Sequence, residues 1–138
     1  MKKILILCTG NSCRSQMAEA ILQSFDKSLF VVSAGTKPEW EVNPRAAKVI
    51  EELGLSLEGH VPKNVNDFIN EEFDYVITVC DSARQICPIF TGKVKHKLHI
   101  GFEDPANAVG TEEEKLEFYR KIRDQIIEKF SELYKEIR

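Results

Sequence analysis

The residues with the clearest chemical potential stand near the start of the chain, where residues 8–15 read Cys-Thr-Gly-Asn-Ser-Cys-Arg-Ser. An apolar run at residues 3–7 precedes them and is typical of a buried strand, and residues 16–22 after them favour a helix. A loop that enters a helix presents unpaired backbone N–H groups, which can converge on the oxygens of a phosphate-like anion. This segment therefore predicts a site where a thiolate attacks the central atom of a tetrahedral oxyanion.

The side chains of this loop suit such a site. Gly10 and Asn11 tolerate positive φ values, and Arg14 offers a planar fork that can bind two oxygens at once. The same N–H groups and Arg14 would favour the thiolate form of Cys8, and Ser15 is placed to donate a further hydrogen bond to that sulfur. We expect Cys8 and Arg14 to be catalytic, and the oxyanion to lie against Thr9, Gly10, Asn11, Ser12, Cys13, Arg14 and Ser15.

Two further cysteines, Cys80 and Cys87, come at the end of a predicted strand over residues 74–80. If the residues between them are helical, the two sulfurs lie on one face roughly 10 Å apart along the axis. A disulfide needs Cα atoms about 4.4–6.8 Å apart, so bridging the pair would require that turn to unwind. A redox switch, two ordinary core or surface residues, and a zinc site completed by His96 and His99 all remain open here, although the cysteine spacing is not that of a usual zinc-binding pair.

Asp104 is the third residue with catalytic potential. It precedes Pro105 and follows a predicted strand over residues 97–101, so it is held out of the helical region at the carboxyl end of that strand. A carboxyl group in that place could protonate an oxygen as it leaves the central atom, which is the work of a general acid. A plain Asp-Pro turn is the alternative interpretation.

The elements that must position these residues alternate along the chain. Apolar runs predict strands at residues 3–7, 29–33, 74–80 and 97–101, and helical patterns cover residues 14–26, 43–53, 111–137 and, more weakly, 65–70. This order favours an α/β fold with a four-stranded parallel sheet flanked by helices in three layers, formed as a single domain by residues 1–138. Ligands in such folds bind beyond the carboxyl ends of the strands, so Cys8, Cys80 and the segment after Gly101 are expected to meet in one pocket.

Composition narrows the setting in which this site works. The 138 residues carry 22 Asp and Glu against 19 Lys and Arg, a net charge of −3, which does not suggest a nucleic-acid or membrane partner. The first apolar run is too short for a signal peptide, so we expect a cytoplasmic location. A monomer is the default expectation for the oligomeric state. Four cysteines in a chain without an export signal favour redox-active thiols or metal ligands over structural disulfides.

Taken together, these segments resemble the low-molecular-weight phosphatase fold and, within it, the thioredoxin-coupled arsenate reductases. The resemblance spans nearly the whole chain and rests on residues 8–19, 33–35, 43–44, 80–88 and 101–106. The loop is shared with tyrosine phosphatases, whereas the pair of Cys80 and Cys87 is what separates the reductases from them. The resemblance implies arsenate as substrate, phosphate or sulfate as other occupants of the loop, thioredoxin as reductant, and no cofactor.

The mechanism implied by the resemblance is a relay of thiols. Cys8 attacks arsenate held by the loop amides and Arg14, while Asp104 acts on the departing oxygen. Cys80 then attacks Cys8, which releases arsenite, and Cys87 attacks Cys80 to leave a Cys80–Cys87 disulfide that thioredoxin reduces. Glutaredoxin would also accept such a disulfide, and Cys13 has no required role.

One position departs from the family pattern. Some members bind potassium through residues that match Asn11, Glu19 and Ser33, together with an acidic residue shortly after the histidine that matches His60. Here the last position is Lys63, whose ammonium could stand where the cation would sit and pair with Glu19. We therefore predict no potassium dependence.

Two alternatives remain from other classes of protein. In a low-molecular-weight protein tyrosine phosphatase the Asp-Pro pair is typically followed by an aromatic residue, whereas Ala106 follows here, although Trp40 could flank the pocket as an aromatic wall. The other alternative is a non-catalytic sensor that binds an oxyanion or a metal.

Overall fold

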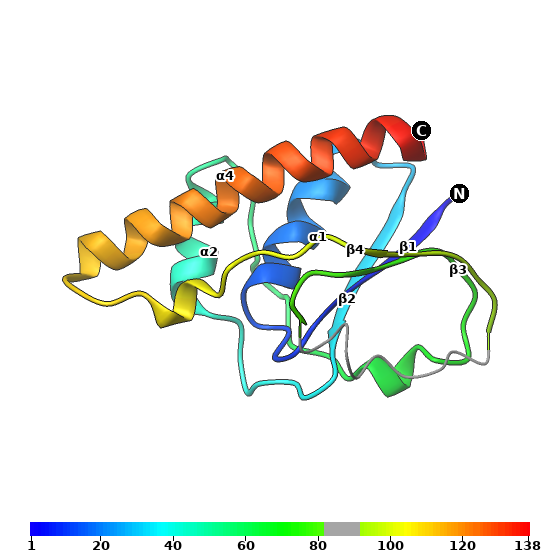
Figure 1. Cartoon of the computed structure of the whole chain (residues 1–138), viewed down its shortest axis with the longest axis horizontal. Coiled ribbons are helices and arrows are strands. Elements are labelled where there is room, and N and C mark those ends of the chain that lie inside the picture. The colour runs from blue at the N-terminus through cyan, green and yellow to red at the C-terminus, as the bar shows by residue number, and fades with distance from the viewer. Residues whose placement is uncertain (82–91) are drawn as a thin grey trace.

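A parallel sheet forms the centre of the computed structural model, which describes residues 1–81 and 92–138 (Figure 1). The strands of this described part are β1 (Lys3–Cys8), β2 (Phe30–Gly35), β3 (Phe73–Thr78) and β4 (Val94–His99). They pair in the order β2-β1-β3-β4, and every pairing is parallel.

The central strand explains the predicted position of the loop. Residues 4–7 of β1 are fully buried, because β1 pairs with a neighbour on each side and is covered on both faces. The register sets Cys8 opposite Gly35 and Leu7 opposite Thr78, so the strands end together at one edge of the sheet. The loop after Cys8 therefore leaves the sheet where the segments after β2 and β3 also leave it.

The three α-helices in the described ranges are α1 (Arg14–Phe25), α2 (Pro44–Glu51) and α4 (Glu112–Ile137). Asn43 caps α2 through its side chain and Pro44 occupies the first helical position, as the sequence predicts. A capping box between Thr111 and Glu114 starts α4. Apolar residues of α4 recur every three or four positions and are buried: Leu116, Tyr119, Ile122, Ile126, Phe130, Leu133 and Ile137.

These helices and the sheet form the layers of an α/β fold. Figure 1 shows α1, α2 and α4 packed together on one side of the sheet, with the 3₁₀ turn η1 (Val65–Asp67) on the other side. Val65 is buried in the core, and Phe68 packs edge-on against Phe73 of β3. The fold class predicted from the sequence is confirmed. No helix within residues 1–81 and 92–138 is long and apolar enough to cross a membrane.

Two predicted elements differ from the structure. The fourth strand covers Val94–His99 instead of residues 97–101, because alternating lysines on a half-exposed outer strand hide its apolar pattern. The helix predicted over residues 65–70 is only the turn η1, which Asn64 caps by accepting a hydrogen bond from the Asn66 N–H. The predicted helical spacing between Cys80 and Cys87 falls outside the described residues.

Candidate active site

The loop between β1 and α1 is shaped by a segment that lies alongside it, residues 36–43, which we call the strap. Backbone N–H groups of the strap donate to the carbonyl oxygens of Cys8, Thr9, Gly10 and Ser12 at 2.8–3.1 Å; the donors are Thr36, Lys37, Glu39 and Asn43. These bonds occupy the carbonyl side of the loop. The N–H groups of the loop are thereby left for the opposite side, where an oxyanion would bind.

Asn11 fixes the shape of the loop. It is fully buried and is the residue with a positive φ (51°) that the loop requires. Its amide nitrogen donates to Ser15 Oγ at 2.8 Å and to Ser33 Oγ at 2.9 Å, while its amide oxygen accepts from the Lys63 N–H at 2.9 Å. Gln16 donates to the Asn11 carbonyl oxygen at 3.1 Å. Asn11 therefore holds the loop from behind, and the part played by Gln16 could not be predicted from local sequence.

Gly10 and Ser15 differ from their predicted roles. Gly10 is not among the described residues with positive φ; instead, a Cβ added to it would lie 2.6 Å from Cγ of Glu39, so its small size makes room for that side chain. Ser15 Oγ accepts the hydrogen bond from Asn11, and no bond from Ser15 to Cys8 occurs in the part of the chain that the structure describes. Ser15 thus supports the loop instead of contacting the nucleophile.

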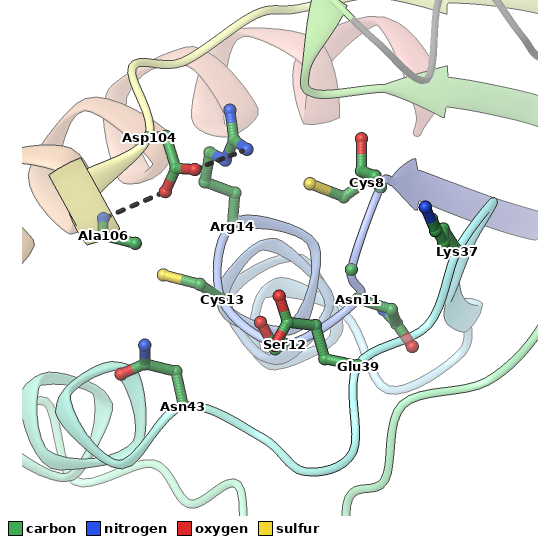
Figure 2. Close-up of a pocket in the computed structure, with 12 residues that line it drawn as sticks. Cys8, Asn11, Ser12, Cys13, Arg14, Lys37, Glu39, Asn43, Asp104 and Ala106 are labelled. Atoms are coloured by element: carbon green, nitrogen blue, oxygen red, sulfur yellow. Dashed lines mark hydrogen bonds and ion pairs between the residues drawn. The ribbon is translucent and has the colours of Figure 1, made fainter.

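A cavity of about 440 Å³ opens over this loop (Figure 2). The predicted loop residues 8–14 and Asp104 line it, and the strap and neighbouring segments add walls that the sequence had not predicted. The additional lining residues are Lys37, Glu39, Asn43 and Ala106. Trp40 is 96% exposed and is not among the lining residues, so the expected aromatic wall is absent from this arrangement.

Arg14 and Asp104 lie side by side in the lining of the pocket (Figure 2). The Arg14 guanidinium donates to the carbonyl oxygen of Phe102 at 3.0 Å and lies 3.5 Å from Asp104 Oδ2. Asp104 also caps the 3₁₀ turn η2 (Pro105–Asn107), since its Oδ1 accepts from the Ala106 N–H at 2.9 Å. Figure 2 shows two of these contacts as dashed lines, one from Asp104 to Arg14 and one from Asp104 to Ala106, beside the sulfur atoms of Cys8 and Cys13. The segment after β4 therefore reaches the loop as predicted.

Cys80 lies beside the nucleophile. It is buried, its sulfur is 3.3 Å from Thr9 Oγ1, and its thiol is close enough to Cys8 to raise the pKa of that residue. Cys8, Cys13 and Cys80 form no disulfide with one another. The structure thus brings together Cys8, Cys80, Arg14 and Asp104, whereas Cys87 lies outside the described residues.

The neighbouring Cys80 thiol changes the expected electrostatics. Its interaction with Cys8 is the largest cause that raises the pKa of Cys8 above its ordinary value, and burial raises that pKa further. Arg14 and the Thr9 N–H lower the pKa, as predicted. The loop therefore favours the Cys8 thiolate, whereas Cys80 and burial oppose it, so a proton has to leave the two thiols before Cys8 can attack.

Cys13 is a further thiol in the pocket lining, and it is kept protonated. Burial first, and the charge of Asp104 second, raise the pKa of Cys13 to about 12, although Arg14 lowers it. A thiol with such a pKa is a poor nucleophile near neutral pH. That Cys13 has no required role stays a prediction.

The residues that match the potassium site form a connected network. Ser33 Oγ donates to Glu19 Oε1 at 2.8 Å, and His60 Nδ1 lies 3.2 Å from Glu19 Oε2. The Lys63 ammonium lies 3.9 Å from Glu19 Oε1, so the predicted pairing of these two side chains is confirmed. Because Lys63 also binds Asn11 through its backbone N–H, this network is joined directly to the loop.

The two histidines considered for a zinc site have other partners. His99 lies 2.7 Å from Thr78 Oγ1 through Nδ1 and 3.1 Å from Asp81 Oδ1 through Nε2. His96 stacks on the ring of Tyr75. Within residues 1–81 and 92–138 there is no cluster of three side chains suited to holding a metal ion.

Comparison with known proteins decides the family to which the chain belongs. The family model described as low molecular weight phosphotyrosine protein phosphatase matches residues 3–138. The chain belongs to this family.

Similar proteins within the family are named as arsenate reductases. The arsenate reductase of Bacillus licheniformis is 42% identical over 135 residues, which cover 95% of this chain and 96% of that protein. A solved structure described as an arsenate reductase in the phosphate binding state has a TM-score of 0.83 at 28% identity and covers all of both chains. The thioredoxin-dependent arsenate reductase of Corynebacterium glutamicum has a TM-score of 0.73 at 28% identity, covering 99% of this chain and 62% of that one.

Proposed function

We propose that the chain is an arsenate reductase, which converts arsenate to arsenite through Cys8, Cys80 and Cys87 and is re-reduced by thioredoxin. The observation that carries this proposal is the position of the buried Cys80 thiol: its sulfur lies 3.3 Å from Oγ1 of Thr9, the residue next to Cys8, and it is close enough to raise the pKa of the Cys8 thiol. A phosphatase needs one thiolate and a water molecule, whereas a reductase needs a second thiol within reach of the first. The named relatives at about 40% identity support the same assignment.

The first step forms a bond between sulfur and arsenic. The Cys8 thiolate attacks arsenate held by the loop N–H groups and Arg14, and one arsenate oxygen leaves as water after Asp104 supplies a proton. Arsenic remains in its pentavalent state in this adduct. Cys80 lies beside Cys8 during this step and is therefore within reach for the next one.

The second step is the reduction. The Cys80 thiolate attacks the sulfur of Cys8, the bond from that sulfur to arsenic breaks, and arsenic keeps the electron pair and leaves as trivalent arsenite. Two thiols have then been oxidised to a Cys8–Cys80 disulfide. Cys87 next attacks Cys80, which frees Cys8 as a thiolate and leaves a Cys80–Cys87 disulfide. A dithiol such as thioredoxin returns this disulfide to two thiols, and we place the reaction in the cytoplasm, where such reductants keep thiols reduced.

The test compares two reactions in the wild type and in Cys80→Ser. Serine keeps a hydroxyl for Thr9 but cannot form a disulfide. We expect arsenate turnover with thioredoxin to fall by at least about 100-fold, whereas hydrolysis of an aryl phosphate, which needs only Cys8, Arg14 and Asp104, stays within a few-fold of wild type. Mass mapping after one arsenate turnover should find Cys80 joined to Cys87. A wild type that hydrolyses the aryl phosphate but does not reduce arsenate would show that the chain is a phosphatase.

A further inference from the structure

A carboxylate faces the oxyanion pocket from the strap. The Glu39 N–H donates to the Gly10 carbonyl oxygen at 2.8 Å, which fixes the backbone of Glu39 beside the loop. Its side chain then crosses over Gly10, since a Cβ added there would be 2.6 Å from Glu39 Cγ and 3.3 Å from Glu39 Oε1. Figure 2 shows the carboxylate reaching toward the middle of the pocket that Cys8 and Arg14 also line.

This carboxylate has acceptor capacity to spare. Within residues 1–81 and 92–138, no cation and no N–H or O–H group is paired with the Glu39 side chain, and Figure 2 shows the ammonium of Lys37 well apart from it. The other carboxylate of the pocket is already engaged, because Asp104 accepts from the Ala106 N–H and lies beside Arg14. Of the two carboxylates in the lining, Glu39 is therefore the one whose oxygens are open to a ligand.

A carboxylate that carries no proton restricts which anions can bind beside it. A carboxylate repels a bound oxyanion unless that anion carries an O–H group, in which case the carboxylate accepts a charge-assisted hydrogen bond. Loop N–H groups and Arg14 bind any tetrahedral oxyanion of the right size, so they do not distinguish between such anions. Among the carboxylates that line the pocket in the described residues, Glu39 is the one placed to accept a hydrogen bond from a protonated oxygen of the bound anion.

We propose that Glu39 is a specificity residue, which selects protonated tetrahedral oxyanions such as hydrogen arsenate and hydrogen phosphate over sulfate. This refines the expectation that sulfate can occupy the loop: sulfate has no proton to offer near neutral pH and meets the carboxylate with two unprotonated oxygens. The inference rests on the proposed function only in naming arsenate as the protonated oxyanion that is turned over. Selection itself is a property of the pocket.

The experiment compares two anions of equal charge and similar shape. At mildly alkaline pH hydrogen phosphate and sulfate are both dianions, so they differ in the proton alone. Dissociation constants are measured by the protection of Cys8 from iodoacetamide in the reduced protein, with alkylated peptides identified by mass. The variants are Glu39→Gln and, as the matched control, Glu41→Gln, which removes the same charge from an exposed residue of the strap that does not line the pocket.

We expect the wild type and Glu41→Gln to prefer hydrogen phosphate, and the preference to fall by about tenfold in Glu39→Gln, because an amide can donate to sulfate and a charge-assisted hydrogen bond is lost for phosphate. Equal tightening of both anions in Glu39→Gln would mean general charge repulsion and would overturn the proposal, as would an unchanged preference. The measurement needs neither arsenate nor thioredoxin nor Cys80. Failure of the reductase assignment would therefore leave it intact, and its own failure would leave the reductase assignment intact.

Discussion

Cys8 and Cys80 illustrate how a single contact decides between two chemistries at the residue scale. The loop around Cys8 is built to hold a tetrahedral oxyanion, and this capacity is shared by phosphatases and reductases. What differs is the group that resolves the covalent adduct on Cys8. A thiol that already lies beside Cys8 has only to lose its proton to attack, whereas water must first be positioned and activated.

Gly35 gives a prediction at the same scale. It ends β2 opposite Cys8, and a Cβ added there would lie 2.4 Å from the Thr9 carbonyl oxygen and 3.2 Å from the Asn11 backbone nitrogen. Gly35→Ala must therefore push the loop away from the strap. We expect a loss of about 1–3 kcal/mol in the free energy of unfolding and, since a misplacement of about 1 Å is costly, a fall of about 100-fold in arsenate turnover.

The matched control for this substitution is Gly92→Ala. A Cβ at Gly92 would lie 2.1 Å from the Glu71 carbonyl oxygen, so the steric conflict is similar but is remote from the loop. Urea unfolding should show that both variants are destabilised. Turnover per folded molecule should fall only in Gly35→Ala, and a comparable fall in Gly92→Ala would contradict a local effect on the loop.

At the element scale, the strap shows what could and could not be predicted from the sequence. Residues 3–7, 8–14 and 16–22 follow local rules for a buried strand, a turn and a helix, so the loop and its two catalytic side chains could be predicted. The strap depends instead on β2 lying parallel to β1, which sets residues 36–43 beside residues 8–12. Nothing local to Lys37, Glu39 or Asn43 indicates that they line the pocket.

The pairing of Cys80 with Cys8 was predictable only in part. Their positions at the carboxyl ends of β1 and β3 indicated that they would be near each other, because adjacent parallel strands end at one edge of the sheet. The close approach of their side chains, and the raised pKa of Cys8 that results, depend on side-chain orientation across two strands. Sequence spacing carries no information on that orientation.

The segment around Lys63 supports a prediction about cations. Its ammonium, at 3.9 Å from Glu19, supplies a positive charge to the network that Ser33 and His60 complete. We expect the activity of the wild type to be the same, within about twofold, in potassium, sodium and choline chloride at equal ionic strength, because a charge that the chain itself supplies does not depend on the cation in solution. A large drop in sodium and choline would show that the network needs a bound potassium ion despite Lys63.

At the scale of the whole molecule, carboxylates form ion pairs between segments that are distant in the sequence. Glu52 at the end of α2 binds Arg120 and Arg123 of α4, and Glu112 of α4 binds Arg45 of α2. Arg120 first, and Arg123 to a smaller extent, lower the pKa of Glu52 to about 2 from an ordinary value of 4.5. Arg45 lowers the pKa of Glu112 in the same way. These ion pairs hold α2, and with it the end of the strap, against the long helix.

Such shifts fix the pH range in which the fold is most stable. A carboxyl group whose pKa is lower in the folded chain contributes stability above its unfolded pKa, and this contribution is lost as the pH falls from about 4.5 toward 2. Cys13 acts in the opposite direction: its pKa rises from 9.0 to about 12 on folding, so the folded chain loses stability as the pH rises through that interval. We therefore expect a plateau in the urea midpoint between about pH 5 and pH 9, with a decline on each side.

Glu52→Gln tests the acid side of this profile, with Glu58→Gln as the matched control, since Glu58 is exposed and has no ion pair within the described residues. Glutamine cannot carry the charge that binds Arg120 and Arg123, so the plateau should be lower and the decline below about pH 4.5 shallower than in the wild type. The alkaline decline should be unchanged, because it arises from buried thiol and phenol groups elsewhere in the chain. An acid decline as steep in Glu52→Gln as in Glu58→Gln would show that the contact between α2 and α4 does not govern acid unfolding.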